Sequence, residues 1–269
     1  MARVEAIPVN RQPDCDRIRL GRGRRKLLKD FAVEDQVAIP SLKSKTAMSV
    51  HFQRELEKLK QSLLSLCNSV LEQVDIAVTS LINRDAELAE KVEREDACID
   101  RAEIDLEEEC LKILALYQPV ARDLRFIVCA LKINNDLERI GDLAVNIAHK
   151  TLALCRCSEL ELPPVLPQMC SSVRQMLRDS VESLVRGDAI LARSVLRRDA
   201  EVDEMKRVVR RWAEDCIRGN LELLSGALAI MAASRNLERI ADHATNVAED
   251  VIYAVEGEIV RHRGSDREG

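Results

Sequence analysis

The chain is poor in aromatic residues, glycine and proline, and this scarcity limits the folds open to it. Of its 269 residues only 2% are aromatic, and it has 9 glycines and 7 prolines. Sandwiches and barrels rely on many turns, so the composition disfavours them. Leu, Ala, Glu and Arg are abundant instead, which is typical of long helices. The length leaves room for two ordinary domains with ample core.

Three further features are missing from the sequence. No uninterrupted apolar run approaches the length of a bilayer span, so no membrane insertion is expected. The first 25 residues lack an apolar signal core, and we expect a cytoplasmic protein. The nine cysteines include no Cys-x-x-Cys motif, and their thiols should stay reduced. We interpret Cys155 and Cys157 as small apolar side chains near a helix end rather than as metal ligands.

Charge is distributed unevenly along the chain. Residues 1–46 carry 11 Lys and Arg against 6 Asp and Glu, whereas the remainder carries 30 against 40. An acidic main part disfavours a surface for duplex nucleic acid, so no such partner is expected. Residues 1–47 show no helical or strand period. They are expected to form a disordered basic extension, or to precede the true start at Met48.

A segment of twelve residues occurs twice. Leu-Glu-Arg-Ile-Gly-Asp-Leu-Ala-Val-Asn-Ile-Ala at 137–148 agrees at eight of twelve positions with Leu-Glu-Arg-Ile-Ala-Asp-His-Ala-Thr-Asn-Val-Ala at 237–248. In each copy the apolar residues follow the spacing of a helix that faces a core. The acids and the Asn are four residues apart and form a second row at the edge of that face. The repeat predicts two similar halves.

Apolar periodicity predicts three long helices in each half. The predicted ranges are 48–82, 86–116, about 121–155, 168–186, 189–218 and 221–256. Asn83-Arg84-Asp85 and Gly187-Asp188 supply a break and a cap between the first and second helix of each half. The fold class is therefore all-α, with two up-down-up three-helix bundles in tandem, each burying its own core. The predicted segments are a first bundle at 48–158, a Pro-rich linker at 159–167, a second bundle at 168–257 and a polar tail at 258–269.

Acidic pairs recur on corresponding helices of the two halves. The second helix of each half carries Asp-x-x-x-Asp and the third carries Glu-x-x-x-Asp. If these helices are antiparallel neighbours, the four acids line one exposed edge. We name the two sets the first seam, with Asp96, Asp100, Glu138 and Asp142, and the second seam, with Asp199, Asp203, Glu238 and Asp242.

Each seam is a predicted metal site. Four carboxylates at one edge repel one another unless cations lie between them, and hard cations prefer oxygen ligands. Magnesium, manganese and iron suit such ligands, and zinc also accepts carboxylates. The alternative is a solvated charged face, because Arg101, Arg139 and Arg239 stand close enough to pair with the acids. Both halves keep the acids while neighbouring polar positions differ, as in Glu103 against Lys206, and this favours metal.

The sequence offers no familiar catalytic constellation. A di-iron bundle would need Glu three residues before a His, but Met48, Asn146, Ile240 and Ile259 occupy those positions. No nucleophile elbow or phosphate loop occurs either. A non-catalytic adaptor is therefore favoured. The alternative is a carboxylate-bridged metal enzyme, a hydrolase or an oxidase, on a helical scaffold.

The two halves share Leu-Glu-Arg-Ile-(Gly/Ala)-Asp-x-Ala-x-Asn-(Ile/Val)-Ala, and Gln118-Pro-Val-Ala-Arg-Asp-Leu-Arg125 enters the first such helix. In these motifs and their order, residues 49–256 resemble the PhoU family of phosphate-signalling regulators. The resemblance implies two three-helix bundles and a metal-binding Glu/Asp-x-x-x-Asp motif that falls on the eight acids of the two seams. The second half departs from the pattern at its helix entry, which reads Gly219-Asn-Leu-Glu-Leu-Leu.

The resemblance also implies a role. PhoU-like proteins are cytoplasmic negative regulators of the phosphate-starvation response. When phosphate is plentiful, they link the phosphate ABC transporter to the phosphate-sensing histidine kinase and hold the response off. By this resemblance we expect a homodimer with the transporter's ATPase complex and the kinase as partners, with bound iron, zinc, magnesium or manganese, and without catalysis.

Overall fold

The computed structural model describes residues 45–157 and 160–257. Within these ranges the backbone forms long helices and no strand, which confirms the all-α prediction. The elements are α1 (Lys45–Asn83), α2 (Ala86–Tyr117), α3 (Ala121–Cys155), α4 (Val165–Arg186), α5 (Ala189–Gly219), the short 3-10 helix η3 (Leu221–Leu223) and α6 (Leu224–Glu256). The predicted basic extension, apart from the first residues of α1, and the polar tail lie outside the described ranges.

Capping residues fix the breaks between helices. The Asp85 side chain accepts a hydrogen bond from the Leu88 backbone N–H at 3.0 Å and so begins α2. Asp188 does the same for α5. Gly187, with φ of +60°, ends α4 in the left-handed conformation that glycine adopts without strain. Both predicted breaks are confirmed, because the side chains that start a helix are legible in the sequence.

Three helix starts differ from the predicted ones. α1 begins at Lys45, ahead of Met48, and η3 occupies residues 221–223 before α6 begins. α4 begins at Val165, so Pro167, the last residue of the predicted linker, lies in its first turn. Proline is tolerated there because the backbone N–H groups of a first turn have no partner within the helix.

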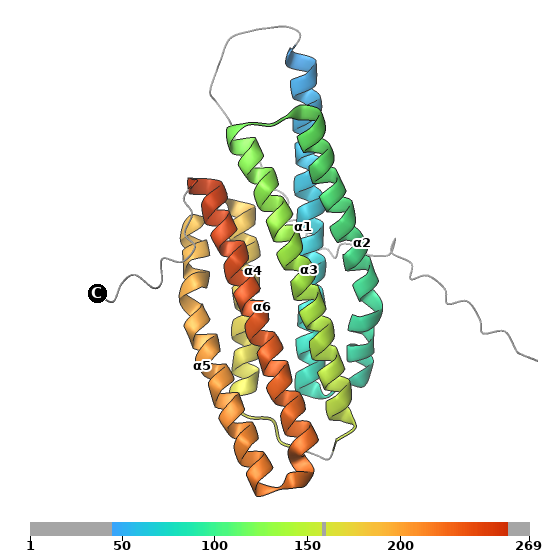
Figure 1. Cartoon of the computed structure of the whole chain (residues 1–269), viewed down its shortest axis with the longest axis vertical. Helices are drawn as coiled ribbons and strands as arrows, with labels where there is room; N and C mark the ends of the chain where they lie inside the picture. The colour runs from blue at the N-terminus through green and yellow to red at the C-terminus, as the bar shows by residue number, and fades with distance from the viewer. Residues whose placement is uncertain (1–44, 158–159, 258–269) are drawn as a thin grey trace, which may run out of the picture.

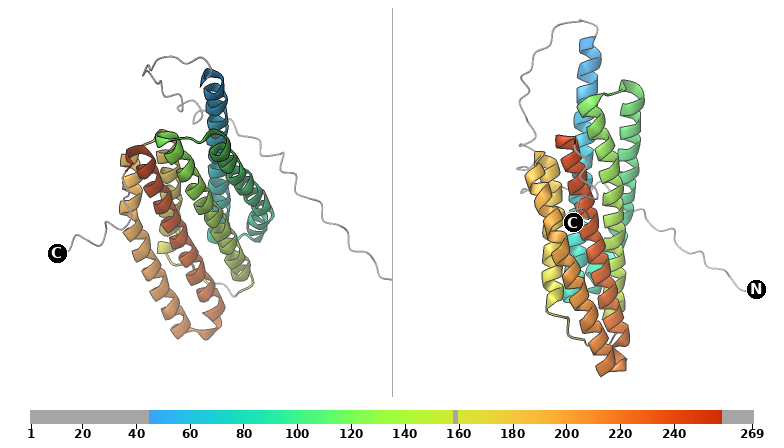
Figure 2. Two further views of the ribbon diagram at one scale, coloured as in Figure 1. Left: turned by 45° about the horizontal axis from the view of Figure 1, so that its top comes forward. Right: turned by 60° about the vertical axis from the view of Figure 1, so that its left-hand side comes forward.

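The helices form two bundles that share one core. α1 to α3 form one bundle and α4 to α6 the other, and α3 lies against α6 at the centre (Figures 1 and 2). We expected each half to bury its own core, and this expectation was wrong, since the buried apolar residues form one continuous cluster. The reason is that α3 and α6 present small side chains such as Ala144 and Ala244 beside the larger apolar ones, so each helix buries two faces.

The two halves are related by an approximate two-fold arrangement around the α3–α6 contact. Cys129 on α3 lies 3.4 Å from the backbone oxygen of Asp250 on α6, so the start of one helix meets the end of the other. On the far side, Arg178 of α4 pairs with Asp75 of α1 at 2.5 Å. The repeated segments therefore occupy equivalent places, with Leu137 and Leu237 both fully buried.

Candidate functional site

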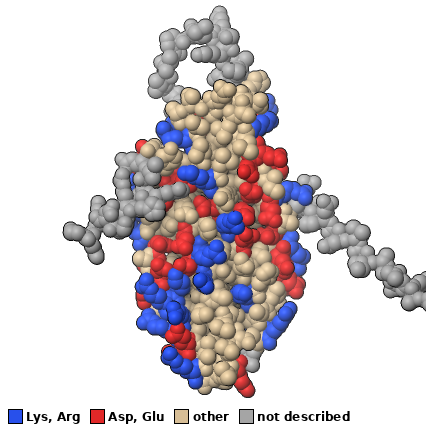
Figure 3. Space-filling model, in the orientation of Figure 1, with Lys and Arg blue, Asp and Glu red and all other residues tan. Residues whose placement is uncertain are grey.

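The seams form where the sequence predicts them. α2 packs along α3, and α5 packs along α6, and each pair is antiparallel (Figure 1). On the face shown in Figure 3, acidic side chains gather over α2 and α3, whereas acidic and basic side chains are mixed over α5 and α6. The two seams thus share a scaffold but differ in their charge.

The first seam is supported from beneath by α1. Gln73 is only 2% exposed, and its Nε2 donates a hydrogen bond to Asp96 Oδ1 at 2.9 Å. Its other polar atom, Oε1, is buried without a hydrogen-bond partner. A Cβ at Gly141 would lie 3.3 Å from that oxygen and 3.8 Å from Asp96 Oδ1. The absence of a side chain at 141 therefore leaves space for Gln73 beside the seam.

Burial and like charge both act on the acids of the first seam. Partial burial raises the pKa of Asp96; the hydrogen bond from Gln73 opposes this, and the charges of Asp100 and Asp142 add to it. Partial burial and then the charge of Asp142 raise the pKa of Glu138. The exposed Arg139 reaches Glu138 at 3.2 Å and Asp142 at 3.8 Å. A cation from outside would relieve the remaining repulsion.

A fifth acid stands at the end of the first seam. Asn134 Nδ2 donates to Glu103 Oε1 at 2.7 Å and to the Glu103 backbone oxygen at 3.0 Å. Partial burial, followed by the charges of Glu107 and Glu138, raises the pKa of Glu103. The first seam can therefore offer several carboxylate oxygens and the Gln73 amide oxygen, which is the donor chemistry of a hard-cation site.

The second seam already contains a positive charge. Lys206 of α5 lies 2.8 Å from Asp203 Oδ1 and 2.5 Å from Glu238 Oε1, and so connects α5 to α6. Partial burial lowers the pKa of Lys206, but the hydrogen bonds to Asp203 and Glu238 outweigh it and raise the pKa overall. The ammonium group is therefore charged at neutral pH.

The two remaining acids of the second seam, Asp199 and Asp242, are affected by the charges of their neighbours. Partial burial, then the charges of Asp203 and Glu238, raises the pKa of Asp199. Desolvation by the flanking helices and the charges of Glu238, Asp199 and Asp203 raise the pKa of Asp242 to about 6, against the pull of Lys206. The eight predicted acids thus lie along two seams, and within each seam the charges of neighbouring acids act on one another.

The acids do not yet converge on one point. Within residues 45–157 and 160–257, no three His, Cys, Asp or Glu side chains are gathered closely enough to hold a metal ion. Ion binding at either seam would require side chains to rotate inward, which helix-surface residues do readily.

Sequence reasoning missed three contacts near the seams. Gln73 gave no signal, because a single Gln in an apolar stripe has no motif. Lys206 appeared only as a difference between the halves. Asn246, predicted to extend the acidic row, instead donates to Asp136 across the α3–α6 contact at 3.1 Å, and His243 lies 2.8 Å from the same carboxylate. Contacts between the halves cannot be read from the period of either half.

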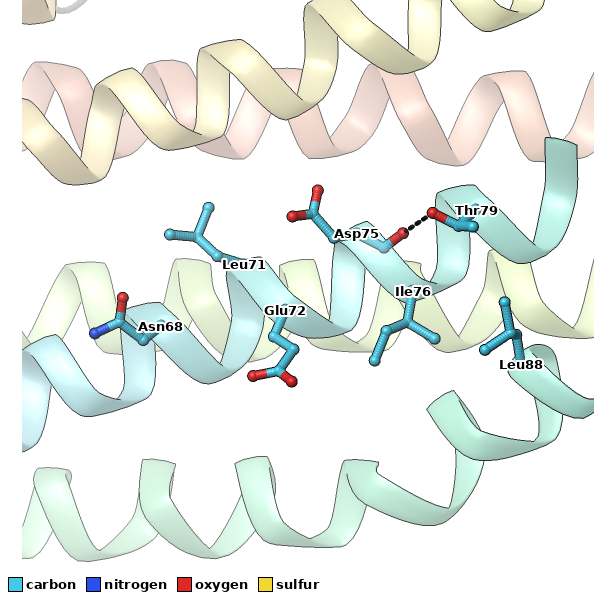
Figure 4. A pocket seen from close by; sticks show the side chains of 7 residues that line it. All are labelled: Asn68, Leu71, Glu72, Asp75, Ile76, Thr79 and Leu88. Carbon is cyan, nitrogen blue, oxygen red and sulfur yellow. Dashed lines mark hydrogen bonds between the residues drawn. The ribbon is translucent and has the colours of Figure 1, made fainter. Parts of the chain in front are cut away.

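A shallow groove lies along α1 beside the start of α2. It has a volume of about 390 Å³ and is lined by Asn68, Leu71, Glu72, Asp75, Ile76, Thr79 and Leu88 (Figure 4). Thr79 Oγ1 donates to the Asp75 backbone oxygen at 2.7 Å, and Arg178 binds the Asp75 carboxylate. Thr79 and Asp75 are thus engaged with other protein groups, and the seams are the stronger candidate site.

Known proteins share this architecture. A protein 40% identical over 221 residues, covering 82% of this chain and 86% of its own length, is the phosphate-specific transport system accessory protein PhoU homolog of Pseudomonas putida. The Aquifex aeolicus protein of the same name is 39% identical and is covered over 98% of its length.

Solved structures agree with the sequence relatives. The crystal structure of PhoU from Pseudomonas aeruginosa matches with a TM-score of 0.73 at 39% identity, over 77% of this chain and 100% of that one. The phosphate transport system regulatory protein PhoU from Streptococcus pneumoniae matches with a TM-score of 0.72 at 30% identity, over 78% of this chain and 99% of that one. The family profile described as the PhoU domain matches twice, at residues 63–151 and 166–251. The chain belongs to the PhoU family.

Proposed function

We propose that the protein is a cytoplasmic accessory regulator of phosphate uptake and phosphate-starvation signalling. It acts as a metal-binding adaptor that links the phosphate ABC transporter to the sensor histidine kinase, and it represses the starvation response when phosphate is plentiful. The observation that carries this proposal is the double match to the PhoU domain, once in each bundle. Relatives over most of the chain bear the name of phosphate transport accessory proteins, which supports the same role.

The first seam is the proposed metal site. Asp96, Asp100, Glu138 and Asp142 supply carboxylate oxygens from two facing helices. The buried Gln73 Oε1, which has no hydrogen-bond partner, supports the fit, because a buried acceptor is costly unless a donor or cation meets it. A bound hard cation supplies the positive charge that this seam needs. The four acids, two on α2 and two on α3, would hold the ion.

An adaptor role also agrees with the surface of the molecule. On the face shown in Figure 3, charged side chains are exposed along the helices that carry the seams, where a partner of complementary charge can reach them. No helix in the described ranges is apolar enough over a sufficient length to cross a bilayer. We propose that the protein works as a homodimer and contacts the transporter through its ATPase complex. Turnover of phosphate esters or reduction of oxygen by metal-loaded protein, abolished in Glu138→Ala, would refute the non-catalytic role.

The proposal is tested in the host cell. A strain without this gene, grown in ample phosphate, should express its phosphate-starvation genes, and the full chain supplied in trans should silence them. Asp96→Asn with Asp142→Asn should fail to silence them, whereas Lys91→Met, which removes an exposed ion pair with Glu95 that includes no seam acid, should succeed. Normal silencing in the strain without the gene would contradict the proposed role.

Binding of the partners is tested separately. The purified full chain should capture the cytoplasmic part of the kinase and the transporter ATPase from defined mixtures of purified proteins. Capture of neither protein, by a chain that is folded by circular dichroism, would rule out the adaptor mechanism while leaving the family assignment intact.

A further inference from the structure

The second seam differs from the first at three positions that act on the same space. The motif Asp96, Ile99, Asp100 on α2 aligns with Asp199, Val202, Asp203 on α5, and this alignment places Lys206 where the first half has Glu103. The first seam thus gains an acid at the position where the second seam gains an ammonium group.

The partners of these two residues differ as well. Glu103 is held by the Asn134 amide at 2.7 Å. Ser234 takes the place of Asn134 in the second half, and its hydroxyl donates to the Met231 backbone oxygen within its own helix. Nothing on α6 therefore draws the residue at 206 away from the acids. Lys206 extends to Asp203 and Glu238 instead.

The buried residue beneath the seam also differs between the halves, and the difference again leaves the second seam with fewer oxygen ligands. Counting back from the helix caps Asp85 and Asp188, Met176 takes the place of Gln73. Met176 is fully buried and has no oxygen to offer, whereas Gln73 presents its amide to Asp96. The second seam has therefore lost two potential oxygen ligands, at positions 176 and 206, and gained a cation. Three separate substitutions point to one outcome.

We propose that Lys206 is a built-in counter-ion that takes the place of a metal ion in the second seam, so that the second seam binds no metal. An incoming cation would have to break both ion pairs of Lys206 and remain close to its like charge. Arg139 does not play this part in the first seam. It is 57% exposed, and it lies on the same helix as the acids it contacts, so it does not bridge two helices. This inference extends the proposed function, which places metal at the first seam.

The experiment replaces two acids of the first seam, so that Mn²⁺ binding at the second seam can be measured alone. Asp96→Asn with Asp142→Asn serves as the background, and Mn²⁺ is the probe, followed by calorimetric titration and by elemental analysis after gel filtration. In this background Mn²⁺ should not bind and should not move the melting temperature. Adding Lys206→Glu, which restores the acid found at position 103, should create a Mn²⁺ site. Adding Asp242→Asn to that protein should weaken Mn²⁺ binding at least tenfold.

A second measurement tests how much the Lys206 ammonium group stabilises the fold. In the Asp96→Asn, Asp142→Asn background and in chelator, adding Lys206→Met should lower the melting temperature by several degrees, and Mn²⁺ should restore part of the loss. Lys91→Met is the matched control, since Lys91 pairs with the exposed Glu95 at 3.7 Å, and its melting temperature should stay within one degree of wild type.

The possible results separate this inference from the proposed function. Binding of Mn²⁺ by the background protein with Lys206 intact would overturn the inference. Lys206→Met and Lys206→Glu variants whose melting temperature is unchanged and which bind no Mn²⁺ would overturn it as well. Failure of the wild-type first seam to bind metal would contradict only the proposed function. The background protein and the Lys206 variants report on the second seam whatever the first seam does.

Discussion

The contact between the bundles can be tested at one buried ion pair. Asp250 of α6 has a side chain only 3% exposed, and Lys132 of α3 reaches its Oδ1 at 3.1 Å. The Lys132 ammonium also lies 5.4 Å from the centre of the Tyr253 ring. Lys132→Met keeps the length and apolar stem of the side chain but removes the charge. The carboxylate of Asp250 would then stay buried but lose its ion pair with Lys132.

The expected loss follows from burial on the two sides of this pair. Removing one partner of a fully buried ion pair costs about 3–5 kcal/mol. Lys132 is 39% exposed, so water screens part of its interaction and we expect about 2 kcal/mol. For a domain of this size, each kcal/mol shifts the melting temperature by roughly 2–4 °C. Lys132→Met should therefore melt about 4–8 °C below wild type.

The free energy of unfolding is measured by urea titration with circular dichroism as the signal, beside a matched control variant. Lys91 is 41% exposed, much like Lys132, but its partner Glu95 is 52% exposed. Lys91→Met should therefore cost less than about 0.5 kcal/mol. If Lys132→Met costs no more than Lys91→Met, the Lys132–Asp250 pair does not hold the bundles together as argued. Adding Asp250→Leu to Lys132→Met should recover part of the loss, because no buried charge then remains.

Three further predictions follow from single features. In chelator, the free energy of unfolding should fall as pH rises from about 4 through about 6, because Asp242, with its pKa raised to about 6, keeps its proton to a higher pH in the folded state than in the unfolded one. Asp242→Asn should reduce this dependence on pH. Urea unfolding at several pH values measures it, and an unchanged dependence in the variant would refute the assignment to Asp242. Asp188→Ala should cost about 1 kcal/mol, since it removes the acceptor for the Ile190 and Leu191 N–H groups that begin α5, and a loss below 0.3 kcal/mol in urea unfolding would show that the cap does not matter. Removal of residues 1–44, whose sequence has no apolar period, should leave the melting temperature unchanged, and a clear drop in a thermal melt would show that this segment packs on the bundles.

The sequence was sufficient to predict the helices and the placement of the acids. Apolar period and capping residues such as Asp85 and Asp188 are local signals, so α2, α3 and α5 appear within a residue or two of their predicted ends. The eight acids were found because the chain repeats itself. Comparison of the two halves separates the positions that carry the same residue in both from those that differ.

The remaining features depend on contacts between distant segments. The shared core was not predicted, because small residues such as Gly141 and Ala144 do not reveal that a helix buries a second face. The roles of Gln73 and Lys206 depend on which side chain reaches across to a neighbouring helix, and this follows only from the packing. Pro167 was assigned to a linker because proline usually breaks a helix, whereas at the first turn it does not.

The most direct test of the central claim is the metal content of the protein itself. The full chain is purified without chelator and without a nickel column, and its metals are determined by elemental analysis beside Asp96→Asn with Asp142→Asn. We predict bound iron, zinc, magnesium or manganese in the wild-type protein, most of it lost in the variant, with the helical signal unchanged. The account would be contradicted if both proteins contained the same amount of metal and if the variant had a higher melting temperature that chelator did not change. The first seam would then be a solvated acidic face.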